Sequence, residues 1–209
     1  SCGKWLATQK RIKRAIDILV SVAGLGLLFP LYVVLGLLIK LDSKGPVLFK
    51  QQRVGKDRRL FNIYKFRTMV QDAENKGKGY LIEKNDFRIT RLGEFLRRYS
   101  LDETPQFLNI IRGQMSLVGP RPTLKYQVDQ YTQRQLIRLK VRPGVTGLAQ
   151  IQGRNELSWP ERIEYDIKYI ETWSLWRDFV IVLKTIGTVI GRKDIYTEDL
   201  SKFDVRDNT

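Results

Sequence analysis

Asp102 and Glu103 are the side chains whose types and spacing point most directly to chemistry in this sequence. An adjacent carboxylate pair can supply a nucleophile, a general acid or base, or ligands for a hard metal such as Mg²⁺. The chain has no His and a single cysteine, Cys2, which excludes Ser-His-Asp and Cys-His catalysis, most zinc sites and an internal disulfide. Catalysis at neutral pH therefore falls to carboxylates, Lys, Arg, Tyr or a bound metal ion.

The residues after the acidic pair predict how it is held. Thr104 followed by Pro105 is typical of a helix start, and Gly113 is a good stop, so a helix is expected over 105–113. The acidic pair would then lie at the positive end of this helix. A capping box between Ser100 and Glu103 is the rival interpretation, disfavoured because it places the proline inside the helix. An ordinary acidic helix start explains the spacing equally well.

Positive charge is concentrated in the first third of the chain. The formal net charge is +15, and residues 1–70 hold 14 Lys or Arg against 3 Asp. Such an excess favours anionic lipid headgroups, nucleic acid or phosphorylated small molecules as partners. With 43% apolar residues over 209 positions, one substantial globular domain with or without an appendage is expected. The lack of a disulfide is typical of a reducing, cytosol-facing location.

Residues 18–39 form an uncharged run of 22 residues. At ~1.5 Å per residue a helix of this length reaches ~33 Å, enough to span a bilayer, and we expect it to insert into a membrane. Pro30 lies near its middle and would bend or break the helix. Lys and Arg flank both ends, although positive charge marks the cytoplasmic side. A re-entrant helix that turns at Pro30 satisfies both observations, and a kinked crossing anchor is the alternative.

Two strands are expected at 47–49 and 60–68, joined by a turn at 55–57. Period-2 alternation places Lys65 and Arg67 on one face of the second strand. Two aligned cations could receive a phosphate, and a solvated strand face is the plainer interpretation.

Later segments carry further helix and loop signals. Leu92, Phe95, Leu96 and Tyr99 recur at helical spacing and predict a short amphipathic helix leading into the acidic pair. Arg121 has a proline on each side, which either aims its guanidinium or only forms a rigid turn. The other expected elements are a surface loop at 71–86, helices at 127–140 and 161–170, glycine-rich loops at 142–147 and 152–155, and an interfacial or core helix over 180–190.

A series of motifs follows a fixed order along about residues 10–196. The motifs are Gly45-Pro46, Gln52-Arg53-Val54-Gly55, Tyr64-Lys65-Phe66-Arg67-Thr68-Met69, Ser100-Leu101-Asp102-Glu103, the stretch from Met115 to Pro122, Gly153-Arg154-Asn155 and Tyr165-Asp166. Taken together they resemble the bacterial sugar transferases, the monotopic phosphoglycosyl transferases that start glycoconjugate assembly.

The resemblance implies a reaction. The enzyme would transfer sugar-1-phosphate from a UDP-sugar to a membrane polyprenyl phosphate such as undecaprenyl phosphate and release UMP. This is the first membrane step of exopolysaccharide, O-antigen or glycoprotein glycan assembly. Asp102 would attack the sugar-bearing phosphorus and carry an aspartyl phosphosugar intermediate, which the lipid phosphate then attacks. Glu103, together with Asp102, would hold Mg²⁺ at the cytoplasmic face of the bacterial inner membrane.

Phosphoryl transfer depends on positioning and charge neutralisation, so several cations are expected around the phosphates. Arg121 is the first candidate. The expected partners are the UDP-sugar, the polyprenyl phosphate and anionic membrane lipids, without nucleic acid, and a homodimer is compatible with the sequence. The further candidate phosphate ligands are Lys65, Arg67, Arg88, Arg98 and Arg154.

The expected fold is α+β and mostly helical. It combines an N-terminal re-entrant membrane helix with a Pro break, a small β-hairpin, and amphipathic interfacial helices around a cytosolic active site. The expected divisions are a tail at 1–9, a basic flank with the membrane helix at 10–44, a catalytic domain at 45–196 and a C-terminal tail at 197–209.

Two alternatives stay open. A membrane-bound basic module without enzymatic activity would bind anionic lipid or nucleic acid, and its affinity for nucleic acid would fall steeply with salt. The second alternative keeps both substrates but lets the lipid phosphate attack the UDP-sugar directly. Release of UMP tests the first alternative, and trapping of labelled sugar phosphate on the protein tests the second.

Overall fold

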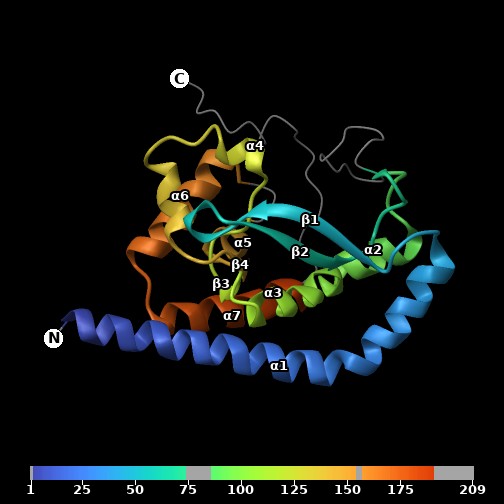
Figure 1. Ribbon diagram of the computed structural model, residues 1–209, viewed down its shortest axis with the longest axis horizontal. Coiled ribbons are helices and arrows are strands. Elements are labelled where there is room, and N and C mark those ends of the chain that lie inside the picture. Colours follow the sequence, from blue (N-terminus) through green and yellow to red (C-terminus); the bar gives the residue numbers. More distant parts are fainter. Residues whose placement is uncertain (1, 74–85, 154–156, 191–209) are drawn as a thin grey trace.

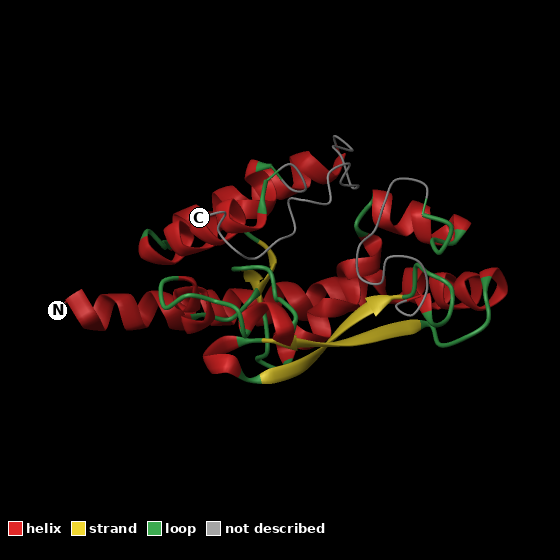
Figure 2. Ribbon diagram, turned by 90° about the horizontal axis from the view of Figure 1, so that it is seen from above, coloured by secondary structure: helices red, strands yellow, loops and turns green. Residues whose placement is uncertain are grey.

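A computed structural model describes residues 2–73, 86–153 and 157–190. Figure 1 shows α1 (Cys2–Asp42) along one edge, a twisted two-stranded hairpin across the middle, and shorter helices between and above them. In the turned view of Figure 2, the hairpin lies along one side of the molecule. The mostly helical class, with a long N-terminal apolar helix and small sheets, agrees with the sequence prediction.

The helix α1 continues through Pro30 over 41 residues. Figure 1 shows it nearly straight over most of its length and bent towards its C-terminal end. A proline inside a helix lacks one backbone hydrogen bond and presses on the preceding turn, which explains a bend. The residues from position 2 that were expected to form a tail are already part of this helix. By length and composition α1 can cross a membrane, and only 11% of its most apolar window is buried.

The helix α1 nevertheless contacts the rest of the protein at both ends of its apolar run 18–39. Near its C-terminal end, Leu35 and Ile39 are buried and pack against Phe66 and Leu96. Nearer the N-terminus, Asp17 is only 3% exposed. The long apolar stretch between these two contacts is mostly exposed.

The hairpin pairs β1 (Leu48–Val54) with β2 (Leu60–Phe66), antiparallel along the full length of both strands. They are joined through η1 (Lys56–Arg58), where Asp57 has a positive φ. The first strand is longer than the predicted 47–49 because polar residues at 50–53 also pair with β2. The second strand ends at residue 66, before the predicted limit at 68.

A short strand precedes the proline-flanked Arg121, and another lies in the predicted loop at 142–147. These strands, β3 (Ser116–Val118) and β4 (Gly144–Thr146), pair in parallel. Directly after β3, a Cβ atom added at Gly119 would lie 2.5 Å from the carbonyl oxygen of Arg142. The two segments therefore approach so closely that this position requires glycine.

The helix expected over 127–140 forms as two separate pieces, α4 (Lys125–Val128) and η4 (Gln135–Lys140). Thr132 lies between them, and its hydroxyl accepts a hydrogen bond from the backbone N–H of Gln135 at 3.3 Å. Thr in such a position starts a new helical turn instead of continuing the previous one. The sequence signal for this cap was missed.

The remaining helices begin and end at recognisable residues. Thr90 caps α2 (Arg91–Arg98), and Ser158 forms a capping box with Glu161 at the start of α6 (Trp159–Glu171). In α7 (Leu175–Ile190), Ile181 is buried, while other apolar side chains face outward, so α7 combines a core face with an exposed apolar face. The exposed ones are Trp176, Phe179, Leu183 and Ile186. The other short elements are η3 (Leu101–Gln106), α3 (Phe107–Ile111) and α5 (Leu148–Gln152).

Candidate active site

The acidic pair lies in the 3-10 turn η3, which runs directly into α3. Neither predicted cap forms. The Thr104 hydroxyl donates to the carbonyl of Leu101 at 2.8 Å, and Ser100, which has a positive φ, makes no side-chain cap. Pro105 has no N–H to donate into the preceding turn, and the Thr104 hydroxyl donates there in its place. The helical turn therefore begins at residue 101, before the predicted start at 105.

Glu103 is neutralised by two cations from different elements. Lys65 Nζ, at the end of β2, and Arg121 Nη2, after β3, each lie 2.7 Å from Glu103 Oε1. Burial by itself would raise the pKa of Glu103, but Arg121 and Lys65 outweigh it and hold that pKa well below its usual range. Glu103 is therefore ionised throughout the physiological pH range and fixes both cations.

Asp102 is in a different state from its neighbour. It is 8% exposed, and among the residues that the structure describes no group donates a hydrogen bond to its carboxylate. Burial, followed by the charge of Glu103, raises the pKa of Asp102 to about 6, against the opposing charges of Lys65, Arg97 and Arg121. At pH 7 the carboxylate is mostly ionised but poorly solvated, which suits a nucleophile or a general base.

Arg121 and Lys65 differ in how far they reach into solvent. The side chain of Arg121 is 47% exposed, whereas that of Lys65 is 19% exposed. Burial lowers the pKa of Lys65, opposed by Glu103, and Glu103 raises the pKa of Arg121. Arg121 is thus the cation of this cluster that is most accessible to an incoming phosphate.

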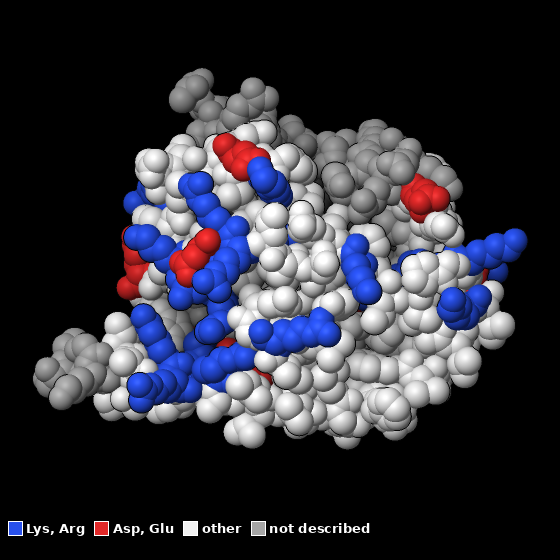
Figure 3. All heavy atoms as spheres, in the orientation of Figure 1, with Lys and Arg blue, Asp and Glu red and all other residues white. Residues whose placement is uncertain are grey.

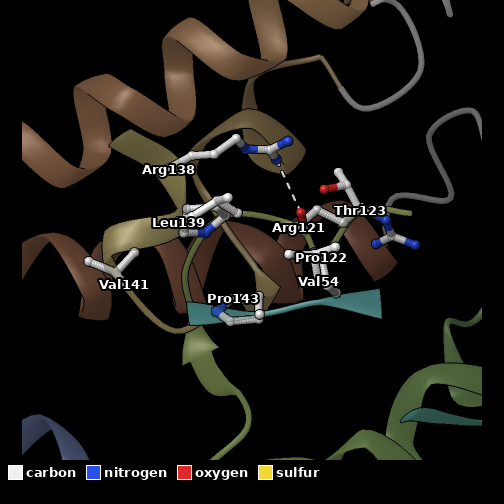
Figure 4. A pocket seen from close by; sticks show the side chains of 10 residues that line it. Val54, Arg121, Pro122, Thr123, Arg138, Leu139, Val141 and Pro143 are labelled. Atoms are coloured by element: carbon white, nitrogen blue, oxygen red, sulfur yellow. Dashed lines mark hydrogen bonds between the residues drawn. The ribbon is translucent and has the colours of Figure 1, made fainter. Parts of the chain in front are cut away.

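The backbone of Arg121 is held by a second, buried cluster. Arg138 donates to the Arg121 carbonyl at 3.1 Å, and Figure 4 shows its guanidinium beside that carbonyl. Arg138 is itself fixed by Asp166 at 2.5 Å and by the Tyr131 hydroxyl. Burial would lower the pKa of Arg138, but Asp166 and Tyr131 raise it above its usual range. Burial also raises the pKa of Asp166, against the opposing charge of Arg138.

The other predicted phosphate ligands have different partners. Arg67 donates to the carbonyls of residues 39, 43 and 44 and so caps the end of α1. The buried Arg88 forms an ion pair with Asp86 at 2.6 Å and donates to the Ala73 carbonyl. Arg98 pairs with Glu94 on the exposed face of α2. Arg154 lies outside the described residues. The structure thus brings together Asp102, Glu103, Lys65 and Arg121, and it does not place Arg67 with Lys65.

Arg97 is a site residue that the sequence analysis missed. Its charge acts on Asp102, and its Nε donates to the Thr68 hydroxyl at 2.8 Å. The neighbouring Arg98 was predicted as a phosphate ligand instead. Adjacent residues on a helix point in different directions, and the buried Leu96 marks the inward face of α2.

Asn109 was also missed. This fully buried side chain bonds the backbone of β2 at Asn62 (2.7 Å) and Tyr64 (3.1 Å). It therefore ties the strand that carries Lys65 to the helix that follows the acidic pair.

The donor set fits a Mg²⁺ ion that also binds substrate phosphates. Both cations contact Glu103 through Oε1, so Glu103 Oε2 and the Asp102 carboxylate are the oxygens that could serve as ligands. Mg²⁺ is commonly held by one or two carboxylates together with phosphate oxygens and water. Within the described ranges no group of three or more Asp, Glu or Cys side chains could hold a metal by protein ligands alone.

Charge and apolar surface are segregated. Figure 3 shows Lys and Arg gathered on one half of the visible face, whereas the edge that follows α1 away from its N-terminus is almost uncharged. An apolar edge beside a basic face is the pattern expected where a protein meets an anionic membrane surface.

Comparison with known proteins identifies relatives. Residues 8–192 match the family model described as "Bacterial sugar transferase". The chain is 44% identical over 185 residues to a UDP-N-acetylgalactosamine-undecaprenyl-phosphate N-acetylgalactosaminephosphotransferase from Aeromonas hydrophila, covering 86% of this chain and 44% of the relative. It is 47% identical over 192 residues to a UDP-glucose:undecaprenyl-phosphate glucose-1-phosphate transferase from Klebsiella pneumoniae, covering 88% and 41%.

A relative of similar length also matches. The exopolysaccharide production protein ExoY from Rhizobium meliloti is 40% identical over 198 residues, which cover 88% of both chains. The present chain therefore spans less than half the length of the first two relatives and most of the third.

Proposed function

Because the chain belongs to the bacterial sugar transferase family, we propose that it is a phosphoglycosyl transferase that moves sugar-1-phosphate from a UDP-sugar to undecaprenyl phosphate or a related polyprenyl phosphate. The observation that carries the proposal is the acidic pair. Asp102 is buried without a hydrogen-bond donor among the described residues, beside a Glu103 that is held by two cations. The names of two relatives specify a UDP-sugar donor and an undecaprenyl phosphate acceptor.

The proposed reaction has two displacements at the sugar-bearing phosphorus. In the first, an Asp102 oxygen forms a bond to this phosphorus while the bond to the bridging pyrophosphate oxygen breaks. The bridging oxygen and its electron pair leave with UMP, and an aspartyl phosphosugar remains. In the second, an oxygen of the polyprenyl phosphate attacks the same phosphorus, and the bond to Asp102 breaks. The products are the polyprenyl diphosphosugar and the regenerated carboxylate.

The neighbouring residues would stabilise charge during both displacements. Arg121, the accessible cation, is placed to contact the phosphate oxygens, while Lys65 keeps Glu103 ionised and adds positive charge to the site. Arg97 opposes the rise in the pKa of Asp102 and so keeps the nucleophile ionised. Mg²⁺ held by Asp102 and Glu103 would neutralise phosphate charge and orient the leaving group.

The proposed metal requirement has a direct test. Thorough chelation with EDTA is expected to abolish UMP release, and added Mg²⁺ is expected to restore it. Binding of Mn²⁺, followed by paramagnetic broadening, should weaken in a Glu103→Gln variant. Full activity after chelation would contradict the metal role.

We propose a re-entrant, monotopic membrane helix for α1. The contacts that support it lie at the two ends of the apolar run 18–39: Asp17 bonds to β3, and Leu35 and Ile39 pack against the hairpin and α2. A helix whose apolar run crossed the bilayer would place the two ends of that run on opposite sides of the membrane, so they could not both contact one body in the cytosol. The bend of α1 and the exposed apolar side chains between the two contacts fit a helix that dips into one leaflet.

The same arrangement favours the cytoplasmic face of the bacterial inner membrane. Basic residues flank α1 on both sides, and positive charge marks the cytoplasmic side. The basic face would hold the domain against anionic lipid and concentrate both phosphorylated substrates. In this arrangement the acidic pair would lie near the headgroup plane, where a soluble nucleotide sugar and a lipid phosphate would meet.

The function is tested by UMP release. Protein purified in detergent with polyprenyl phosphate should release UMP from at least one UDP-sugar in a panel containing glucose, galactose and N-acetylgalactosamine, the sugars named for its relatives. An Asp102→Asn sample of equal membrane association serves as the control. Failure of the wild-type protein with every nucleotide sugar would reject the proposed function.

A further inference from the structure

A polar stripe interrupts the apolar surface of α1. Lys13, Asp17, Ser21 and Gly24 are spaced by four, four and three residues, which places them on one face of a helix. Asp17 is 3% exposed and Ser21 is fully buried, although most of α1 faces outward. A membrane anchor alone does not require a buried carboxylate, so this face has a separate role.

Side chains of this stripe form hydrogen bonds with every residue of strand β3. The Asp17 carboxylate accepts from the Ser116 hydroxyl at 2.7 Å and from the backbone N–H of Leu117 at 3.1 Å. One turn earlier, Lys13 donates to the Val118 carbonyl at 3.1 Å and is held by Asp178 of α7 at 2.6 Å. Hydrogen bonds to charged groups are among the stronger ones in proteins, so the position of β3 depends on α1.

Strand β3 leads directly to Arg121. Only Gly119 and Pro120 lie between Val118 and Arg121. Gly119 is packed against the backbone at 142–144, with no room for a Cβ atom, and proline fixes its own φ. This short, stiff connection would transmit a shift of β3 to the arginine that contacts Glu103.

The same part of α1 also contacts the helix after the acidic pair. Arg14 donates to the carbonyls of Ile110 and Ile111, at 2.8 and 3.2 Å. Gly24 lies so close to Phe107 that an added Cβ atom would be 2.8 Å from its ring. Segment 13–24 therefore contacts two elements of the site: α3, which follows the acidic pair, and β3, which leads to Arg121.

We infer that Asp17 and Lys13 are positioning residues for the transfer reaction, because they fix the strand that places Arg121 opposite Glu103. The inference rests on the proposed function and adds a role to α1 beyond membrane attachment. Segment 13–24 is part of the frame of the active site, and the exposed apolar side chains that follow it, such as Leu27 and Phe29, are the ones that would face lipid.

Two conservative variants, one in α1 and one in β3, test this inference, and a third substitution in α1 serves as the control. Asp17→Asn keeps the shape but removes the charge, and Ser116→Ala removes one hydroxyl partner. Leu27→Ala, at a side chain 82% exposed on α1, is the matched control. Each is assayed for membrane retention, for kcat, and for the KM of the UDP-sugar and of the polyprenyl phosphate.

The expected result is a defect in donor use. Asp17→Asn should lower kcat/KM for the UDP-sugar by about 10- to 100-fold, the scale seen when reacting groups are misplaced by about 1 Å. Membrane retention and the KM for the lipid acceptor should stay unchanged. Ser116→Ala should give a smaller loss in the same direction, and the two losses should not add in the double variant because both remove one contact. Leu27→Ala should behave as wild type.

If Asp17 affects the reaction through Arg121, the two substitutions should not act independently. Combined with Arg121→Lys, the Asp17→Asn substitution should cause little additional loss. Wild-type donor kinetics in both Asp17→Asn and Ser116→Ala would overturn the inference, as would a full additional loss in the Arg121→Lys background. If Asp17→Asn does not fold, Ser116→Ala decides alone. Absence of UMP release from the wild-type protein would instead reject the proposed function.

Discussion

Two buried clusters of carboxylates and cations lie near one another and differ in completeness. In the first, Glu103 is held by Lys65 and Arg121, and Asp102 beside it has no donor within the described part of the chain. In the second, Arg138 and Asp166 face each other at 2.5 Å with side chains 3% and 2% exposed. The Arg121 side chain of the first cluster is 47% exposed.

The difference indicates that the first cluster takes part in the reaction and that the second supports it. The second cluster is sealed from solvent, and through Arg138 it holds the Arg121 carbonyl. The first cluster is open on one side and contains an ionised carboxylate whose pKa burial raises to about 6. An incompletely compensated charge lowers stability and is typical of a functional site. Substitutions in the first cluster should therefore lower activity strongly without lowering stability, whereas substitutions in the second should lower stability strongly and activity little.

The largest effect on activity is expected for Asp102→Asn, because it removes the proposed nucleophile. Turnover should fall by about 10⁴-fold or more. Since burial raises the pKa of Asp102 to about 6, this carboxyl increasingly destabilises the fold as the pH rises from about 4 to about 6. The neutral amide should therefore stabilise the protein at pH 7 by about 1–3 kcal/mol. UMP release and thermal unfolding check the two halves of this prediction. Unchanged turnover would contradict the assigned role.

A smaller loss is expected for Arg121→Lys. Lysine keeps the charge but loses the planar fork that contacts a carboxylate and a phosphate together. Turnover should fall by about 100-fold, mainly through kcat/KM for the UDP-sugar. Because the native side chain is half-exposed, the melting temperature should change little. A large loss of stability would show that Arg121 belongs to the supporting structure.

Titration of Asp102 in the metal-free protein should reflect its burial. The carboxyl carbon, followed by NMR after thorough chelation, is expected to titrate with a midpoint near pH 6, because burial raises the pKa of Asp102 to about 6. Lys65 opposes the rise of that pKa, so Lys65→Met should move the midpoint to higher pH. A midpoint at the ordinary carboxylate pKa near 4 in the metal-free protein would contradict the raised pKa.

The smallest loss of turnover, with the largest loss of stability, is expected for Asp166→Asn. It leaves the buried Arg138 without a charged partner, so the fold should lose about 3 kcal/mol. Turnover of the remaining folded protein should fall less than tenfold, because the effect reaches Arg121 only through its backbone. Glu164→Gln, on the same helix with a 53% exposed side chain, is the control and should change neither quantity. Equal stability of the two variants would refute the supporting role.

The sequence predicted which side chains gather around the acidic pair better than it predicted the frame that supports them. The acidic pair, Lys65 and Arg121 were identified from residue type and from the resemblance to a family. Arg67 and Arg88 were assigned to phosphate, but their partners are carbonyls and Asp86, because an arginine in a sequence does not show whether backbone oxygens or a ligand will surround it. These partners depend on the tertiary fold.

The local backbone geometry at the acidic pair could not be predicted from the sequence either. Thr104 or Ser100 was predicted to cap a helix, whereas Ser100 has a left-handed backbone conformation and a 3-10 turn begins at residue 101. The support from α1 had a signal that was not used: Lys13, Asp17 and Ser21 recur every four residues along one face. Helical spacing of polar residues from the basic flank into the start of the apolar run indicates such a face.

Covalent labelling tests the central claim most directly. Wild-type protein is incubated with a radiolabelled UDP-sugar without polyprenyl phosphate, quenched and digested, and the labelled peptide is sequenced. The account predicts sugar phosphate attached to Asp102, sensitive to hydroxylamine as expected for an acyl phosphate, and absent from Asp102→Asn. Release of UMP during turnover without any label on the protein would contradict the account and favour direct attack by the lipid phosphate.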